Sequence, residues 1–119
     1  MPYLKPTDYQ WKEGRGYRKA VLLQDSHLQA PGTLVQIIEF APQSSVPPHH
    51  HKTTLEVFHM LEGRGTMTVD GRQYDLIPGD TLTCEPPAIH DAANPHDTPW
   101  RFIVFKTNVT PDDLYWVES

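Results

Sequence analysis

Residues 49–63 read HHHKTTLEVFHMLEG, and this stretch carries the clearest structural signal in the chain. In its TLEVFHML portion, an extended strand places Glu56, Phe58 and Met60 on one face and the intervening residues on the other. Both faces are largely apolar, which is typical of a strand that lines an interior and is also covered by a second layer or by a partner subunit. The stretch therefore predicts a buried β-strand.

Six further segments have the same strand character, because each is short, rich in β-branched and aromatic residues, and bounded by proline or glycine. They are 17–23, 33–40, 65–70, 72–77, 80–85 and 100–106. Asp70-Gly71 is a pair that favours a tight hairpin turn, and Pro78-Gly79 fits a type II turn. Thr110 to Asp113 predicts the start of a short helix, with threonine as the N-cap. The pattern as a whole predicts an all-β sandwich or barrel.

Composition limits the classes of protein that this chain can belong to. Its 119 residues suit one domain, 1–119, and the formal net charge of −5 argues against nucleic-acid or anionic-membrane binding. There is no apolar run of the roughly 18 residues that a membrane helix needs, and the first residues lack the apolar region of a signal peptide. A single cysteine, Cys84, excludes an internal disulfide. We expect a cytoplasmic protein.

The histidines gather just before the strand at 54–61. Four of the seven lie between residues 49 and 59. In an extended segment, His49 and His51 point to the same side while His50 points away, so two imidazoles can converge on one ion. Glu56 shares its face with apolar side chains, where a bare carboxylate is costly and a bound cation removes that cost.

A fourth ligand is available from His90, which follows a pair of prolines. Three imidazoles and one carboxylate suit a transition metal such as Fe, Mn, Zn, Ni or Cu better than Ca or Mg. Such a set leaves coordination positions open on a six-coordinate ion, as a catalytic metal requires. The alternative interpretation of 49–56 is a solvent-exposed polar strand edge without a metal.

The spacing of these residues resembles the two sequence motifs of the cupin superfamily. The first motif is HxH, three or four residues, Glu, six residues and Gly; the second ends in His, three residues and Asn. The matching residues here are His49, His51, Glu56 and Gly63, followed by His90 and Asn94. The resemblance covers most of the chain, from about residue 33 to about residue 106.

The resemblance implies a double-stranded β-helix, which is a jelly-roll barrel, with a divalent transition metal (Fe, Mn, Zn or Ni) near its centre. By motif position the implied ligands are His49, His51, Glu56 and His90. The resemblance also implies a metal-dependent oxidoreductase or lyase, similar to a dioxygenase or decarboxylase, acting on a small oxygen-bearing substrate that the metal coordinates. Glu56 would then act as a ligand or as a catalytic base.

Two other functions stay open at this stage. One is a non-catalytic cupin that binds or senses a small molecule, and the other is a sugar isomerase or epimerase. The fold hosts many chemistries, so whether the chain is an enzyme is also open.

Two positions depart from the cupin pattern. Gln43 stands where the first motif usually begins with glycine, six residues before His49. The second motif usually reads PxG before the histidine, whereas this chain has Pro86-Pro87-Ala88. Proline cannot adopt the positive φ that glycine allows, so we expect a differently shaped turn ahead of His90.

Four residues are candidates for the substrate pocket. Phe58 and Met60 share the face of Glu56, where core packing is their first expected role and ligand contact the second. Gln36 and Arg101 are polar residues within apolar strands, and each belongs either to the surface or to the pocket. An inward Arg101 would select an anionic substrate, because its guanidinium pairs with carboxylate or phosphate.

The remaining side chains that could bind a metal or react have simpler expected roles. His50 is expected to face outward as a spectator, His59 to lie in packing or at an interface, and Cys84 to be a small buried residue. The apolar outer face of 55–61 and the aromatic N-terminal segment 1–16 suggest packing on the barrel or on a partner. We therefore expect a homodimer.

Overall fold

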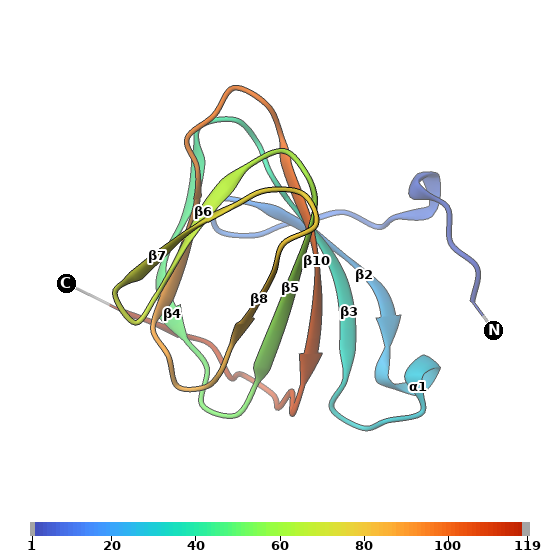
Figure 1. Cartoon of the computed structure of the whole chain (residues 1–119). Helices are drawn as coiled ribbons and strands as arrows, with labels where there is room; N and C mark the ends of the chain where they lie inside the picture. The colour runs from blue at the N-terminus through green and yellow to red at the C-terminus, as the bar shows by residue number, and fades with distance from the viewer. Residues whose placement is uncertain (1, 118–119) are drawn as a thin grey trace.

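The computed structural model describes residues 2–117, which form two antiparallel β-sheets facing each other (Figure 1). The larger sheet has the strand order β1-β2-β3-β10-β5-β8 and the smaller one β11-β4-β9-β6-β7. Strands of the larger sheet are β1 (Lys12–Glu13), β2 (Arg18–Gln24), β3 (Leu34–Phe40), β10 (Trp100–Thr107), β5 (Leu55–Glu62) and β8 (Thr81–Cys84). Those of the smaller sheet are β11 (Tyr115–Trp116), β4 (Ser44–His50), β9 (His90–Asn94), β6 (Gly65–Val69) and β7 (Arg72–Leu76). The predicted all-β jelly-roll is confirmed.

Alternation along the strands separates the interior from the surface as the sequence predicts. In β5, Glu56, Phe58 and Met60 are buried, while His59 and Leu61 are exposed. In β10 the buried positions are Trp100, Phe102 and Val104, which face the space between the two sheets. Trp100 has no exposed surface at all and stacks its ring close to those of Phe40 and Phe102. These three aromatic side chains thus form one cluster within the core.

Both predicted turns are present. The β6–β7 hairpin turns at Asp70 and Gly71, whose φ angles of 48° and 84° are the positive values that a tight hairpin requires. At the second turn, Gly79 has a φ of 95° and the N–H of Asp80 donates to the carbonyl of Ile77 at 3.1 Å. These turns connect the strands between the two cupin-like motifs.

The predicted helix start at 110–113 is wrong. The segment is a turn, because Asp112 adopts a φ of 57°, which is incompatible with a right-handed helix. Asp113 turns its carboxylate back toward the backbone of Lys52, Thr53 and Thr54 instead of capping a helix. The residues that follow form β11, which pairs with the end of β4.

Two strands have little strand character in the sequence. β4 contains Pro47 and Pro48, and β9 is the polar and alanine-rich segment HDAAN. Their pairing is interrupted between Val46 and His49, which fits the missing N–H groups of the two prolines. Tertiary pairing rather than local propensity makes these segments strands.

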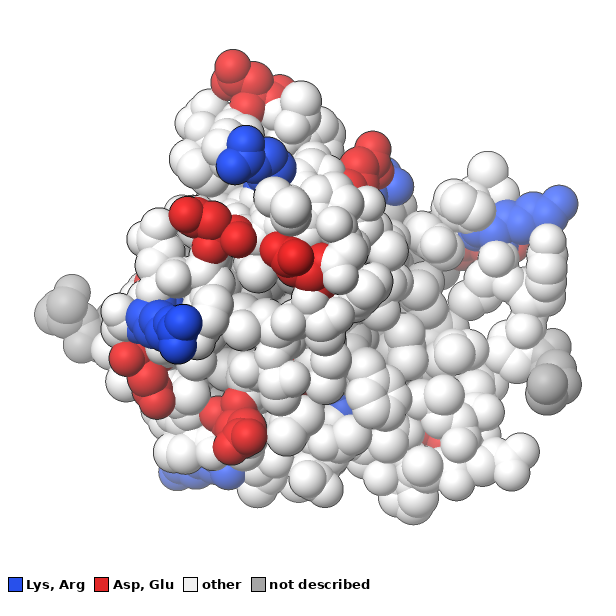
Figure 2. Space-filling model, in the orientation of Figure 1, with Lys and Arg blue, Asp and Glu red and all other residues white. Residues whose placement is uncertain are grey.

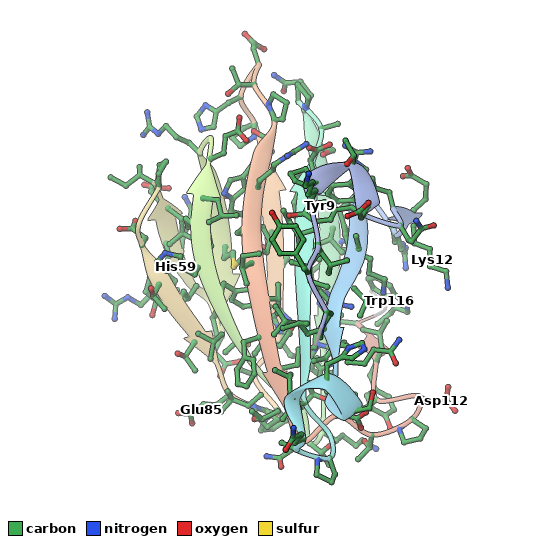
Figure 3. The ribbon with its side chains drawn as sticks, turned by 90° about the vertical axis from the view of Figure 1, so that its right-hand side faces the viewer. Tyr9, Lys12, His59, Glu85, Asp112 and Trp116 are labelled. Carbon is green, nitrogen blue, oxygen red and sulfur yellow. The ribbon has the colours of Figure 1, made fainter. Side chains whose placement is uncertain are left out.

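The N-terminal segment includes the 3₁₀ turn η1 (Pro6–Asp8) and extends away from the barrel before β1 joins β2 (Figure 1). Seen from the side, Tyr9 lies in front of the larger sheet (Figure 3). Trp11 places its ring 4.0 Å from the guanidinium carbon of Arg18, and Arg18 and Arg101 both donate to the carboxylate of Glu39. This contact ties the segment to the outer face of the sheet. The helix α1 (Asp25–Leu28) is a single turn after β2.

On the face shown in Figure 2, acidic and basic side chains are interspersed. None of the helices within residues 2–117 combines the length and the apolar character needed to cross a bilayer.

Candidate metal centre

Three histidines converge at the end of the smaller sheet. His49 on β4 lies directly opposite His90 on β9 in the antiparallel register, and their ring centroids are 4.2 Å apart. His51 follows β4 by one residue and points to the same side as His49. One nitrogen from each ring lies within 4.8 Å of the others, a spacing at which all three can bind one ion. The structure therefore brings together three of the four predicted ligands as one group.

Each of these imidazoles is held in the same tautomer by the backbone. In every ring Nδ1 lies at hydrogen-bonding distance from a carbonyl oxygen, which can only accept. The acceptors for His49, His51 and His90 are the carbonyls of Pro47, Asp113 and Ala88, at 2.8, 2.6 and 3.1 Å. Nδ1 must therefore carry the proton, and Nε2 is left with a free lone pair. A metal-binding histidine has this arrangement, because the outer hydrogen bond fixes the ring and makes the ligating nitrogen more basic.

Glu56 lies beside two of the three histidines. Its side chain is buried, and Oε1 is 2.9 Å from Nε2 of His51 and 3.2 Å from Nε2 of His90. Within residues 2–117, neither Glu56 Oε1 nor His90 Nε2 takes part in a well-formed hydrogen bond. A carboxylate oxygen that faces imidazole lone pairs is repelled by them unless a proton or a cation lies between. The donor atoms thus fit a bound cation.

The shifted pKa values of Glu56 and His90 also indicate that the site favours a positive charge beside the Glu56 carboxylate. Burial would raise the pKa of Glu56, but His51, His90 and the ammonium group of Lys106 hold it well below its usual range. Burial would lower the pKa of His90, but contacts with Cys84 and Glu56 raise it to about 10. Burial and the neighbouring His90 lower the pKa of His49 to about 4. Without a metal, a proton on His90 would supply the positive charge that Glu56 requires, and a bound cation would take its place.

The C-terminal segment supports this site from outside. Asp113 accepts hydrogen bonds from the N–H groups of Lys52, Thr53 and Thr54 at 2.7, 3.0 and 3.0 Å. Its carbonyl oxygen accepts from His51, and Trp116 packs its ring 5.3 Å from that of His49. The loop between the histidines and Glu56 is thus anchored to residues 108–117. The sequence analysis predicted only a short helix start at 110–113 and missed this support.

Two connected cavities adjoin the histidines. The inner one, of about 60 Å³, is lined by His49, Glu56 and His90 together with apolar side chains of both sheets. The outer one, of about 260 Å³, is bordered by His49, His51, Glu56 and the C-terminal segment. His49 and Glu56 belong to both linings, so they lie where the two spaces meet.

The four predicted pocket residues separate into two groups. Gln36 and Phe58 line the inner cavity. Met60 is 1% exposed and packs in the core without bordering either cavity. Arg101 lies on the outer face of β10, where it pairs with Glu39, so of its two expected places the structure shows the surface and not the pocket. Strand parity explains this, since Phe102 and Val104 occupy the inward positions of β10.

Three pocket residues escaped the sequence analysis. Tyr17 and Lys106 line both cavities, and Lys19 borders the outer one. Lys106 shares the parity of the inward Phe102 and Val104, a signal that the segment 100–106 already contained. Its Nζ lies 3.8 Å from Oε2 of Glu56.

The two departures from the cupin pattern are accommodated locally. Gln43 adopts the left-handed conformation, with a φ of 60°, and its side-chain amide donates to the carbonyls of Pro95 and His96. The turn before His90 contains a cis peptide bond between the two prolines and is closed by a hydrogen bond from the N–H of Ala88 to the carbonyl of Glu85. His90 still lies opposite His49.

The remaining expected roles have mixed outcomes. His50 stacks on Tyr115, with 5.2 Å between ring centroids, and lies outside the three-histidine group. His59 is exposed and contacts Thr81 rather than being packed. Cys84 is buried, as expected. Asn94 is buried and donates to the carbonyls of Ala41 and Thr98, so it braces neighbouring turns.

The chain is thus a small jelly-roll protein in which three clustered histidines are spaced so that they could hold one metal ion. A family model described as a cupin domain (Cupin_2) matches residues 36–106. The match spans more than half of the chain, and the chain belongs to the cupin family.

Solved structures with this fold differ in their described activities. A polyketide cyclase from Streptomyces resistomycificus superposes with a TM-score of 0.84, at 21% identity over 100% of this chain and 87% of the other. A predicted oxalate decarboxylase from Thermotoga maritima gives 0.81, at 20% identity over 91% and 100%. A sugar phosphate isomerase from Silicibacter pomeroyi gives 0.78, at 21% identity over 99% and 83%. At these identities the likeness shows the fold.

A curated relative from Methanocaldococcus jannaschii is described as an uncharacterised protein. It is 34% identical over 55 residues, which is 46% of this chain. The aligned region covers 44% of the relative, so this chain spans less than half of that protein.

We expect the hydrogen bonds to Asp113 to hold the loop that follows His51 in place. Replacing Asp113 with alanine removes the acceptor of three N–H groups, so the amides of Lys52, Thr53 and Thr54 should exchange about tenfold faster or more. Hydrogen exchange followed by NMR measures this. Asp112→Asn is the matched control, because asparagine tolerates the positive φ there.

The same contact has a defined pH dependence. Burial would raise the pKa of Asp113, but the hydrogen bonds from Lys52, Thr53 and Thr54 keep it well below its usual range. The stabilisation is therefore complete above the ordinary aspartate pKa of about 4 and is lost only as the pH falls through the lower folded value. Equal exchange in Asp113→Ala and wild type would contradict the anchoring role.

Proposed function

We propose that this cupin binds one divalent transition metal, such as Fe, Mn, Zn or Ni, through His49, His51, His90 and Glu56. The observation that carries the proposal is the common tautomer of the three histidines, whose Nδ1 atoms face backbone carbonyls. Their free Nε2 atoms and the unsatisfied Oε1 of Glu56 supply the donor types that such a metal prefers. A bound metal would act there as a Lewis acid that polarises an oxygen atom of the substrate.

We further propose that the bound molecule is a small oxygen-bearing substrate and that the protein is a lyase or oxidoreductase. The chain's own residues support such chemistry in a partly dry site. Phe58 and other apolar side chains limit water around the inner cavity, which strengthens electrostatic interactions inside it. Glu56 is held ionised by its neighbours, which suits a metal ligand. It would serve as a base for a substrate proton only after moving away from the groups that lower its pKa.

The fold relatives include a protein described as a predicted oxalate decarboxylase, whose substrate type would fit a small polar cavity. A sugar phosphate is also a small oxygen-bearing molecule. The site therefore supports a class of reaction, and a panel of compounds is needed to identify the individual substrate.

Metal binding is tested by a double substitution. His49→Ala/His51→Ala removes two of three imidazoles, so metal content of protein purified without a polyhistidine tag should fall from near one per chain to below about a tenth. Elemental analysis measures the metal, and circular dichroism checks that the variant is folded. His27→Ala/His59→Ala is the matched control, because both histidines are exposed and lie outside the group. Equal metal content in the two variants would refute the ligand assignment.

Catalysis is tested separately from binding. Metal-loaded protein is incubated with a panel of enols, diketones and small carboxylic acids while oxygen uptake and carbon dioxide release are followed. We expect turnover of at least one compound, lost in Glu56→Gln by a factor of about a hundred or more, because the glutamine cannot accept a proton. Tight binding of panel members without any turnover would favour a binding or sensing cupin.

We also propose that the chain forms a homodimer through the outer face of the larger sheet. Phe105 pairs in register with Val57 on one side and Val35 on the other, and it is 36% exposed. Leu61, further along β5, is 46% exposed. Adjacent apolar side chains open to solvent are typical of a subunit interface.

Light scattering at micromolar concentration tests the association. The measured mass should be about twice the 13.6 kDa of one chain. A charge among the apolar side chains of Val35, Phe105 and Val57 should disrupt the interface. Phe105→Glu should therefore shift the mass to that of one chain. A wild-type monomer would contradict the proposal.

A further inference from the structure

The cavity that adjoins the histidines has a cationic wall built by the larger sheet. Lys106 on β10 lies opposite Glu56 in the register, and Lys19 on β2 lies opposite Ile38, which in turn lies opposite Phe102. Ile38 and Phe102 belong to the core, so this parity directs Lys19 toward the interior side of the sheet. Both lysines border the outer cavity, which His49 and His51 also line.

Within residues 2–117, Glu56 is the only carboxylate that forms an ion pair with either lysine. Nζ of Lys106 is 3.8 Å from Oε2 of Glu56, a distance longer than a hydrogen bond. Within the described residues 2–117, Lys19 takes part in no ion pair. Burial, followed by Lys106 and Lys12, lowers the pKa of Lys19, and only Glu56 acts in the opposite direction. Two like charges that face one cavity attract an anion into it.

An unpaired amide lies between the two lysine-bearing strands. Gln36 on β3 is 4% exposed and lines the inner cavity, and its inward neighbour on β10 is Val104. Among the hydrogen bonds within residues 2–117, none involves the Gln36 side chain. Its amide atoms are not among the fully enclosed, unsatisfied polar atoms of residues 2–117, so they face the open space of the cavity. Gln36 therefore offers a hydrogen-bonding group to whatever occupies the cavity.

Negative groups also border the outer cavity. Asp112 and Asp113 lie on the C-terminal segment, and the carboxylate of Asp113 is occupied by N–H groups of the loop at 52–54. Of the other two carboxylates, Asp112 is exposed on the C-terminal turn, and Glu56 faces the imidazoles with its other oxygen. A cation bound by the histidines and Glu56 would leave Lys106 with still less compensation.

We propose that Lys19 and Lys106 form an anion subsite, so that the substrate is a small molecule with a carboxylate or phosphate group. The anionic group lies against the two ammonium groups, Gln36 contacts the deeper part of the molecule, and another oxygen atom faces the histidines. This inference rests on the proposed function, since it names the substrate class of the same site. It assigns to lysines the anion selection that sequence reasoning gave to Arg101.

Calorimetric titration of tag-free, metal-loaded protein tests the subsite with three probes. Malonate carries the carboxylates, malonamide is its neutral counterpart, and inorganic phosphate represents the other anion. Lys19→Met and Lys106→Met should each weaken binding of the preferred anion about tenfold, the usual effect of losing a contact with a charged group. Malonamide affinity should change less than about twofold, because it lacks the charge. The stronger-binding anion in wild type identifies the anionic group.

Three controls keep the result interpretable. Lys5→Met removes the same charge from the exposed N-terminal segment and should bind like wild type. Lys19→Arg and Lys106→Arg retain the charge and should recover most of the affinity, which excludes a general folding defect as the cause. Elemental analysis of every variant shows whether the metal is retained.

The outcomes separate the two proposals. Unchanged anion affinity in both methionine variants, or no anion binding by metal-loaded wild type, overturns the subsite and leaves the metal proposal intact. Lysine-dependent anion binding by a wild-type protein that holds no metal supports the subsite and overturns the metal proposal.

Discussion

The burial of the Glu56 carboxylate between the two sheets is the constraint on which the site depends. Leaving an ionised carboxylate unpaired in a protein interior costs several kcal/mol, even after the structure relaxes. Positive or polarisable groups from separate elements offset this cost. His51 and His90 lie at one oxygen, and Lys106 lies near the other. Because the imidazoles present lone pairs, a proton or a cation must complete the arrangement. The same charge balance that stabilises Glu56 thus prepares a place for a metal.

The geometry of the histidines depends on backbone carbonyls instead of side-chain carboxylates. Pro47 and Ala88 each lie two residues before the histidine that they orient, and Asp113 comes from the far end of the chain. Proline fits at position 47 because the strand pairing is interrupted there and its missing N–H leaves no partner unsatisfied. Backbone carbonyls therefore orient the three rings, and no further buried carboxylate is needed for this purpose.

Charge is distributed unevenly around the pocket although the chain is acidic overall. The formal net charge is −5, yet the inward faces of β2 and β10 carry lysines at the mouth of the cavity. Field lines concentrate in a cleft with low-dielectric walls, so local groups outweigh the net charge there. Arguments from composition use the net charge of the whole chain, so they carried no information about the sign of the pocket.

The sequence by itself determined the strand alternation, the two turns, the cupin family and the identity of the histidines, because these depend on short-range periodicity and on residue spacing. It did not predict β4 and β9 as strands, since prolines and small polar residues have low strand propensity and only pairing with neighbours holds them extended. It also left the facing of Arg101 open and overlooked Lys19 and Lys106, because facing depends on which layer covers each strand. Asp113 shows the same limit: its acidic turn looks like a helix start locally, but it closes over a loop about 60 residues earlier in the chain. Only the tertiary structure decided these points, since contacts between residues distant in sequence set the positions of the charges.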